Sequence, residues 1–372
     1  MDKIAIIGTS VGQRELYIKA KAAGYYTIGF SWDKSPEVLG YIDRFYNISI
    51  KEKDEIVRIC REESAIGVVS NGSELTAQIS SYVAERLGLP CTPYTTILNI
   101  QNKKWVREMT QNIIGLSQIN YKLYDDNCTY SYPCIVKPVI GGGKSGVSYV
   151  SCSSDFIKAI QYAQAEKEPI LIEEYVDGKE VSVETISFNG NHHIIQITDK
   201  DSSGPPHFVE LGHHQPTDLS VESKKQINNI IPVLLNKLGF TNGATHIELK
   251  ISDAGVFLIE VNPRGGGDLI STKLVELSTG YDYILAMIQV AIGRFTYEPV
   301  NIGSYSGIYF LTKQTEQMLP FFMAAKQYDW YVEGEIFSND LKVSLGNSMK
   351  DGYVIYKSNH KIELKDQKYE RE

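Results

Sequence analysis

Two acidic side chains and one amide lie within a short segment whose pattern predicts a β-hairpin. The segment reads His-Ile-Glu-Leu-Lys from His246, turns at 252–255 (Ser-Asp-Ala-Gly) and continues as Phe-Leu-Ile-Glu-Val-Asn. Because side chains alternate along a strand and this turn composition is typical of hairpins, Glu248, Glu260 and Asn262 can converge on one point. Carboxylate and amide oxygens are hard ligands that suit Mg²⁺, which also accepts phosphate oxygens. The hairpin therefore predicts a magnesium site.

A fixed cation follows the predicted metal ligands. Pro263 ends the second strand, and Arg264 stands before three glycines at 265–267. The simpler alternative is an amphipathic hairpin whose acidic face is solvated. We favour the metal site because the acids are matched across a turn and an Asn-Pro-Arg-Gly sequence follows them.

A glycine-rich loop lies between two predicted strands within 132–150. It reads Ile-Val-Lys-Pro-Val-Ile-Gly-Gly-Gly-Lys-Ser-Gly-Val, with Lys137 at the end of the first strand. Such a loop can fold over a triphosphate with its backbone N–H groups directed at the oxygens. It is not a P-loop, because Pro138 replaces the required first glycine and a strand follows instead of a helix. A flexible surface hairpin would explain the glycines but not a lysine at the end of a buried strand.

Acidic residues also mark the connection between the next two predicted strands, at 169–175 and 181–188. A connection of this kind can offer backbone groups to an adenine edge, while a carboxylate such as Glu180 reaches ribose hydroxyls. The alternative for Glu173 and Glu174 is plain charge at a strand end.

Residues 204–216 combine a Gly-Pro-Pro sequence with His213 and His214. Their composition predicts a mobile loop over a site. Either histidine could act as an acid–base group or contact substrate, although loop histidines usually do neither.

The first hundred residues show the alternating strand and helix pattern of a small α/β sheet. Apolar runs at 3–8, 26–30 and 66–70 predict buried strands, and helices are expected at 53–62 and 74–87. The turn after the first run resembles part of a dinucleotide-binding fingerprint, but its third glycine is missing. We therefore expect this lobe to be scaffold and part of an acceptor-substrate site.

The remaining segments are expected to connect and support these sites. Residues 92–120 predict a mostly helical connector that carries Lys103 and Lys104 near its start. A helix is also expected at 221–238, and 269–293 is expected to be helical with an interruption near Thr279-Gly280. Short strands after 305 predict a small β-rich end piece.

The bulk composition describes an ordinary globular chain. It has 372 residues, of which 42% are hydrophobic and 22% charged, so two or three lobes are expected. A net charge of −8 without a basic run argues against nucleic-acid binding. The sequence contains no long apolar run, no signal peptide is expected, and the five cysteines lack metal-ligand spacing. We expect a cytoplasmic protein that binds no membrane.

These segments, in this order, resemble the ATP-grasp superfamily, and within it carboxylate–amine ligases similar to bacterial L-amino-acid (dipeptide) ligases. The resemblance covers nearly the whole chain. It rests on the Gly8 loop, Asn102-Lys103, Ile135-Val136-Lys137-Pro138 with 141–147, Glu173-Glu174-Tyr175-Val176-x-Gly178-x-Glu180, Glu210-x-Gly212-His213-x-x-Pro216, His246-x-Glu248 and the run from Ile259 to Gly267.

The resemblance implies an α/β (α+β) chain with an ATP-grasp fold. A Rossmann-like domain is expected at 1–92 and a helical connector at 93–122. A small lobe with the glycine-rich lid and the adenine hinge is expected at 123–185. The C-terminal lobe, with the magnesium site and a short β-rich end, is expected at 186–372.

The resemblance also implies ATP and Mg²⁺ (or Mn²⁺) as cofactors and gives each matching residue a role. ATP binding falls to Lys103, Lys137, Gly141, Gly142, Gly143, Lys144, Ser145, Gly146, Glu173, Glu174, Tyr175, Val176 and Glu180. The metal ligands are Glu248, Glu260 and Asn262. Catalysis falls to Arg264, Lys200 and His213, and substrate binding to Glu210, Arg264, Gly266 and Gly267. Two choices stay open, between Lys103 and Lys104 at the phosphates and between His213 and His214 at the site.

The implied activity joins a carboxylate to an amine through an acyl phosphate and releases ADP and phosphate. Small-molecule substrates, among them amino acids, and a homodimer are expected. One alternative is other ATP-grasp chemistry, such as a purine-pathway or biotin-type carboxylase, or a ligase of a sugar or antibiotic precursor. Another is a non-catalytic nucleotide-binding protein, which would be expected to lack a metal ligand or Arg264.

Overall fold

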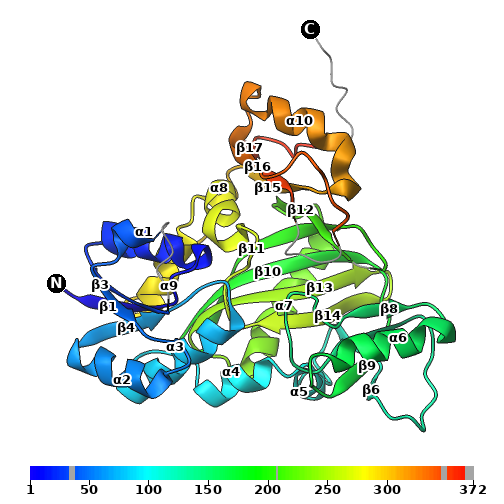
Figure 1. The fold of residues 1–372 in the computed structure, drawn as a ribbon, viewed down its shortest axis with the longest axis horizontal. Helices are drawn as coiled ribbons and strands as arrows, with labels where there is room; N and C mark the ends of the chain where they lie inside the picture. The colour runs from blue at the N-terminus through cyan, green and yellow to red at the C-terminus, as the bar shows by residue number, and fades with distance from the viewer. Residues whose placement is uncertain (33–37, 207, 345–349, 365–372) are drawn as a thin grey trace.

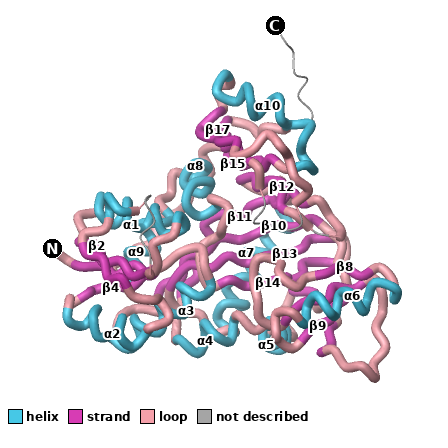
Figure 2. The backbone as a smooth tube through the Cα atoms, in the orientation of Figure 1, coloured by secondary structure: helices cyan, strands magenta, loops and turns pink. Residues whose placement is uncertain are grey.

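The protein is described by a computed structural model over residues 1–32, 38–206, 208–344 and 350–364. Its described strands form three sheets, of four, nine and four strands. In Figure 1 the N-terminal sheet lies at the left, the long sheet crosses the middle and the small sheet lies at the lower right; Figure 2 shows the same strands in magenta. The site described below lies between the long sheet and the small one.

The N-terminal sheet is parallel, in the order β3-β2-β1-β4. Helices alternate with its strands, which confirms the predicted α/β lobe. The bounds are β1 Lys3–Ile7, α1 Arg14–Ala22, β2 Tyr26–Ser31, β3 Arg44–Asn47, α2 Lys53–Glu62, β4 Ala65–Val69 and α3 Glu74–Leu87.

Helix α9 (Tyr283–Ala291) joins the N-terminal lobe to the long sheet. Its apolar residues Ile284 and Ile288 share one buried cluster with Ile4 of β1 and Ile186 of the long sheet. A continuous apolar core fixes two elements relative to one another, because separating them would expose that area to water. The preceding residues form a π-helical turn, Ile270–Leu274, and α8, Val275–Thr279. The predicted break near Thr279 is confirmed.

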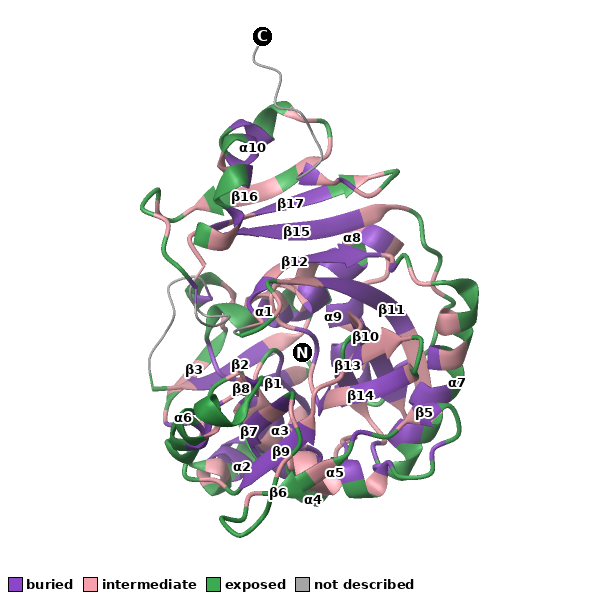
Figure 3. Cartoon of the chain, turned by 90° about the vertical axis from the view of Figure 1, so that its right-hand side faces the viewer, coloured by how far each residue is buried: buried purple, intermediate pink, exposed green. Residues whose placement is uncertain are grey.

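The long sheet has the order β16-β17-β15-β12-β11-β10-β13-β14-β5, and Figure 3 shows these strands one above another. Helix α7 (Val221–Lys237) packs on it through Ile227, Ile231 and Leu234. The strand bounds are β5 Leu116–Ser117, β10 Lys179–Phe188, β11 Asn191–Ser202, β12 Glu210–Gln215, β13 Gly243–Ser252, β14 Gly255–Asn262, β15 Tyr305–Leu311, β16 Tyr331–Ile336 and β17 Gly352–Ser358.

The prediction of a loop over 204–216 was wrong for residues 210–215, which form β12 between β11 and β15. The run Glu-Leu-Gly-His-His-Gln has no apolar alternation, so its sequence carries no strand signal. Its polar side chains tolerate burial because neighbouring strands pair them: Glu210 lies 3.1 Å from Lys200 and His214 lies 3.2 Å from Asp201. The predicted β-rich end piece consists of β15, β16 and β17, which continue the same sheet beyond β12.

The small sheet has the order β6-β9-β7-β8 and carries the glycine loop between β7 and β8. Its helix, α6, packs Ala159, Ile160 and Ala163 against the strands. The bounds are β6 Tyr121–Leu123, β7 Cys134–Pro138, β8 Ser148–Val150, α6 Ser153–Gln164 and β9 Ile170–Glu174. The strand after the loop confirms that this segment is not a P-loop.

A buried ion-pair network ties the small sheet to the rest of the chain. Arg107, on α5 (Lys103–Met109), donates from Nε to Glu173 Oε1 at 2.8 Å and from Nη2 to the carbonyl of Ile259 at 3.1 Å. Lys137 Nζ lies 2.7 Å from Glu173 Oε2. Burial alone would raise the pKa of Glu173, but the two cations lower it to about 2. One carboxylate therefore holds β7, β9 and α5 together.

The described chain contains no helix that is long and apolar enough to cross a membrane. The division at 92, 122 and 185 remains a proposal; its last boundary falls inside β10, which belongs to the long sheet.

We predict that Glu173→Gln destabilises the fold by about 3 kcal/mol at pH 7, because Arg107 and Lys137 would stay buried without a counter-charge. Since the folded pKa of Glu173 lies at about 2, the carboxylate stabilises the fold above its unfolded pKa. This stabilisation is lost as the pH falls from about 4.3 towards 2. Urea unfolding of both proteins at pH 7 and pH 3 measures the difference, which should shrink at pH 3.

The control is Glu62→Gln, which removes an exposed ion pair to Arg58 on α2. This change should affect the free energy of unfolding far less. Equal effects of the two substitutions would contradict a special role for the buried network.

Candidate active site

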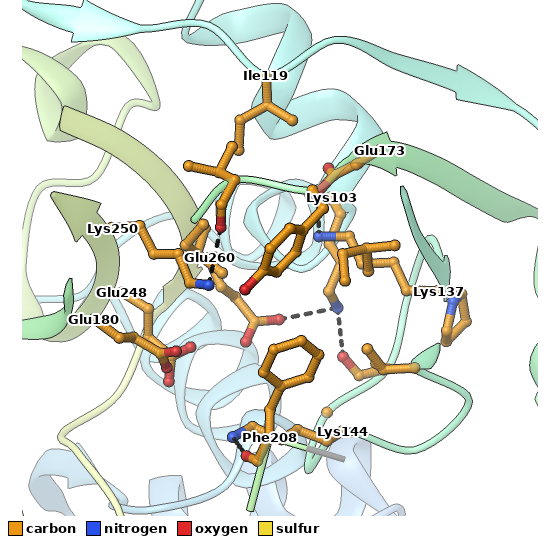
Figure 4. Close-up of a pocket in the computed structure, with 18 of the residues that line it drawn as sticks. Lys103, Ile119, Lys137, Lys144, Glu173, Glu180, Phe208, Glu248, Lys250 and Glu260 are labelled. Atoms are coloured by element: carbon orange, nitrogen blue, oxygen red, sulfur yellow. Dashed lines mark hydrogen bonds and ion pairs between the residues drawn. The ribbon is translucent and has the colours of Figure 1, made fainter. Parts of the chain in front are cut away.

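A pocket opens between the small sheet and the hairpin of β13 and β14 (Figure 4). Twelve of the predicted ATP-binding residues line it, and Gly146 does not. The lining includes Lys103, Lys137, Gly141, Gly142, Gly143, Lys144, Ser145, Glu173, Glu174, Tyr175, Val176, Glu180, Glu248 and Glu260. Segments far apart in the sequence thus meet at one cleft, as the motif order implied.

The glycine loop reaches across the cleft. Lys144 Nζ donates to the carbonyl of Phe208 at 2.5 Å and lies 3.2 Å from Glu210 Oε1 on β12. Gly141 accepts a hydrogen bond from Lys103 Nζ at 2.6 Å. These contacts bring the loop of the small sheet against the long sheet, so they cover the pocket from one side.

The structure distinguishes Lys103 from Lys104. Lys103 faces the pocket, where its Nζ lies 2.9 Å from Glu260 Oε1. Lys104 lies on the outer face of α5 and pairs with Glu108 one turn along the helix. Only Lys103 is therefore placed to meet a ligand in the pocket.

One end of the pocket is apolar and aromatic. Ile119, Ile135 and Ile259 line it, and Lys250 Nζ donates to the carbonyl of Val176 at 3.0 Å. The same ammonium lies 4.8 Å from the ring centroid of Tyr175. Apolar walls with a few polar groups beside them are typical of a site for a heteroaromatic base.

Glu248 and Glu260 stand opposite one another in the β13–β14 register, and Asn262 Nδ2 lies 3.5 Å from Glu260 Oε2. The predicted convergence of these three side chains is thus seen. The residue types fit a hard divalent cation: two carboxylates line the pocket, and the amide side chain of Asn262 lies beside one of them. Nearby ammonium groups lower the pKa of both carboxyls, against the upward effect of burial.

Lys200 is the buried centre of an ion cluster. Its Nζ lies 2.6 Å from Glu248, 3.1 Å from Glu210 and 3.2 Å from Glu180, and its side chain is only 2% exposed. Burial alone would lower the pKa of Lys200, but the three carboxylates raise it well above its usual value. The lysine therefore stays charged and holds three strands' carboxylates at one point.

Arg264 connects the site to the N-terminal lobe. Its guanidinium lies 2.8 Å from Glu74 Oε1, at the start of α3. Two of the glycines that follow leave no room for a side chain. A Cβ on Gly265 would lie 2.6 Å from Asn71 Oδ1, and one on Gly266 would lie 2.9 Å from Glu184 Oε1. No Cβ contact restricts Gly267. The first lobe thus lies against the loop that carries the arginine.

The structure also distinguishes the two histidines. His213 directs Nε2 at Glu210 (3.2 Å) and at Asp268 (3.5 Å). His214 points to the other face of the sheet, towards Asp201 and Tyr356. Burial would lower the pKa of His213, but hydrogen bonds to Asp268 and Glu210 raise it overall.

Several partners of the site were not predicted as site residues. Glu184 accepts from the amide of Gly266 at 3.0 Å and contacts His246, which lies 3.3 Å from Glu248. Arg107 contacts Glu173 of the small sheet, and Glu74 of the N-terminal lobe contacts Arg264. Sequence gave a signal for His246 and Lys250, which share a strand face with Glu248. Arg107 and Glu184 each lie four residues after a motif residue, Lys103 and Glu180, but their partners Glu173 and Gly266 come from other segments, so local spacing could not identify their contacts.

Comparisons with known proteins agree with this geometry. Residues 130–273 match the family model described as an ATP-grasp domain. Carnosine synthase 1 of Mus musculus is 26% identical over 273 residues, which are 65% of this chain and 33% of that protein. The chain spans no more than about a third of the length of carnosine synthase 1 from mouse or human.

Two solved structures show the fold. An L-amino acid ligase from Bacillus licheniformis matches with a TM-score of 0.82 at 24% identity, over 97% of this chain and 94% of that chain. An N5-carboxyaminoimidazole ribonucleotide synthetase, solved as an ADP complex, matches with a TM-score of 0.77 at 16% identity, over 96% and 93%. The chain therefore has the ATP-grasp fold over nearly its whole length, and residues 130–273 match the ATP-grasp domain model.

Proposed function

We propose that the protein is an ATP-dependent ligase that joins a carboxylate to an amine through an acyl phosphate, with amino acids as substrates. One observation carries this proposal: paired Glu248 and Glu260 face a pocket that is covered by a glycine loop, and Arg264 lies close enough to feel the charge of both carboxylates. The similarity to an L-amino acid ligase and to carnosine synthase 1 supports it. A cytoplasmic homodimer with small-molecule substrates belongs to the same proposal.

In this proposal the nucleotide lies along the pocket. The adenine sits among the apolar residues beside the backbone of Val176, and Glu180 meets the ribose. The triphosphate lies beneath the loop 141–146, near Lys103 and Lys137. Backbone N–H groups of a glycine-rich turn favour phosphate oxygens, and the lysines add charge-assisted hydrogen bonds.

Glu248, Glu260 and Asn262 would hold Mg²⁺ (or Mn²⁺). The ion would supply charge neutralisation for transfer of the γ-phosphoryl group to the substrate carboxylate. Lys103 and Lys200 already neutralise the same carboxylates, which keeps them ionised and oriented. The cluster around Lys200 therefore presents deprotonated ligands at neutral pH.

Arg264 and the covered pocket serve the second half of the reaction. An acyl phosphate is destroyed by water, so the contact of Lys144 with Phe208 and Glu210 would exclude solvent. Arg264 would stabilise the oxyanion that forms when the amine attacks, an effect of roughly 3 kcal/mol per donor. Glu74 fixes the arginine for this role. His213 and Glu210, with the Gly266 and Gly267 backbone, would orient the substrate.

The fold similarity to an N5-carboxyaminoimidazole ribonucleotide synthetase favours one alternative, ATP-grasp chemistry on another acid such as bicarbonate. A non-catalytic nucleotide-binding role has less support, since all the predicted metal ligands and Arg264 are present in the chain and two of these ligands, Glu248 and Glu260, line the pocket.

We predict that ADP release from Mg²⁺-ATP requires two amino acids and that mass spectrometry detects the dipeptide. Glu248→Gln should reduce this release by roughly a hundredfold or more, because a charged ligand of the phosphate-bound cation is lost. The control is Glu276→Gln, which changes an exposed residue on α8 and should retain activity. Release with bicarbonate alone would select the alternative chemistry, and full activity of Glu248→Gln would refute the site.

We also predict that Lys103→Met weakens binding of a non-hydrolysable ATP analogue by about tenfold, because one charge-assisted hydrogen bond to phosphate is lost. Lys104→Met is the matched control and should bind as the unchanged protein does. Isothermal titration calorimetry with MgCl₂ present measures both. A loss confined to Lys104→Met would contradict the orientation of α5.

A further inference from the structure

A second charged cluster lies beside Glu210, and its members are not among the residues that line the proposed nucleotide pocket. Lys350, just before β17, places its Nζ 2.6 Å from Asp268 Oδ2 and 3.4 Å from the ring centroid of Phe310 on β15. Its side chain is only 11% exposed. A carboxylate and an aromatic face around one ammonium group form a recognition arrangement for cations.

This cluster is in contact with the proposed active site. His213 lies 3.5 Å from Asp268 and stands edge-on to Phe310, with ring centroids 5.7 Å apart. The same histidine lies 3.2 Å from Glu210, whose other oxygen contacts Lys200. A group held by Asp268 would therefore sit within two side chains of the carboxylates that face the nucleotide.

The backbone at Asp268 is unusual. Asp268 has φ of 50° and Leu269 has φ of 64°, and the π-helical turn Ile270–Leu274 follows directly. Consecutive non-glycine residues in the left-handed region are uncommon and occur preferentially at ligand sites, as π-helical turns do. Ser271 Oγ donates to the carbonyl of Gly266 at 2.7 Å and so fixes the turn. The carboxylate of Asp268 is thus held in position by a strained and braced segment.

We propose that Asp268, Phe310 and His213 form a subsite for a non-reacting ammonium group of the donor substrate, and that Lys350 occupies this subsite until substrate displaces it. The inference rests on the proposed function. The attacking amine must be neutral to have a free electron pair, whereas this subsite stabilises the charged form. The ammonium that binds here therefore belongs to the substrate whose carboxylate is activated, which makes that substrate an amino acid.

A metal ion is a different occupant to consider. Ligand atoms of Glu210, His213 and Asp268 lie within 4.8 Å of one another. Both carboxylates, however, already face ammonium groups: Lys200 and Lys144 contact Glu210, and Lys350 contacts Asp268. A dication would have to enter among three ammonium groups and, unlike the ion proposed at Glu248 and Glu260, would have no triphosphate beside it to offset their charge. An ammonium group that replaces Lys350 therefore fits the cluster better.

The test measures binding by isothermal titration calorimetry, without turnover. The probes are glycine, β-alanine and 4-aminobutyrate, each paired with the acid that lacks the ammonium group: acetate, propionate and butyrate. Lys350→Met should bind at least one of the three amino acids about tenfold more tightly than the unchanged protein, because the subsite no longer has an internal occupant. The paired plain acid should bind both proteins equally.

Asp268→Asn should weaken binding of the same amino acid by about tenfold and leave its plain acid unaffected. Lys350→Arg, which keeps a cation at the subsite, should not gain affinity. Lys342→Met changes an exposed lysine of the same segment and should match the unchanged protein. Lys350→Gln repeats the test if the methionine variant does not fold.

The proposal falls if Lys350→Met and Asp268→Asn change the amino acids and the plain acids alike, since the ion pair would then be structural only. It also falls if none of the three amino acids binds Lys350→Met, or if that variant instead binds ZnCl₂ tightly. ADP release separates the two hypotheses. If binding is selective for the ammonium group but no ADP is released, the subsite is supported and the ligase activity is refuted. If ADP is released without such selectivity, the ligase activity is supported and the subsite is refuted.

Discussion

The repulsion among carboxylates is the constraint that shapes this molecule. Glu180, Glu210 and Glu248 come from three different strands and all lie within 3.2 Å of Lys200 Nζ. Without that ammonium, the three charges could not share a nearly water-free point, because each would have to protonate or move apart. One buried lysine on β11 therefore meets carboxylates of β10, β12 and β13 and stabilises their alignment. These four strands are neighbours in the long sheet, so its strand order brings the members of the cluster side by side.

Two buried lysines differ in the number of carboxylates that they contact, and their pKa values shift in opposite directions. Lys200 has three carboxylates, and its pKa is raised well above the usual value. Lys137 shares the single carboxylate of Glu173 with Arg107, and burial lowers its pKa. The first arrangement favours a permanently charged anchor within the long sheet. The second leaves excess positive charge beside the glycine loop, where the proposed triphosphate would lie.

Local patterns predicted the parts of the site that lie within one hairpin or one loop. Glu248 and Glu260 were placed together because strand alternation and turn composition fix their register within a few residues. Strand β12 was not predicted because its polar side chains are stabilised by contacts with Lys200, Asp201 and Tyr356, which lie on other strands. The contact of Arg264 with Glu74 joins residues 190 positions apart, and nothing in either segment alone specifies it. Long-range charge pairing is thus the information that sequence patterns lacked.

The same pairing recurs wherever a substrate group is proposed to enter. Lys103 contacts Glu260, Lys144 contacts Glu210 and Lys350 contacts Asp268, and in each pair the two residues come from different elements. A carboxylate loses solvation in such a partly buried position, so a lysine partner lowers the free energy of the folded chain there. A substrate cation can then exchange with the lysine at nearly constant local charge. Exchange of partners, and not creation of new charge, would therefore accompany binding in this fold.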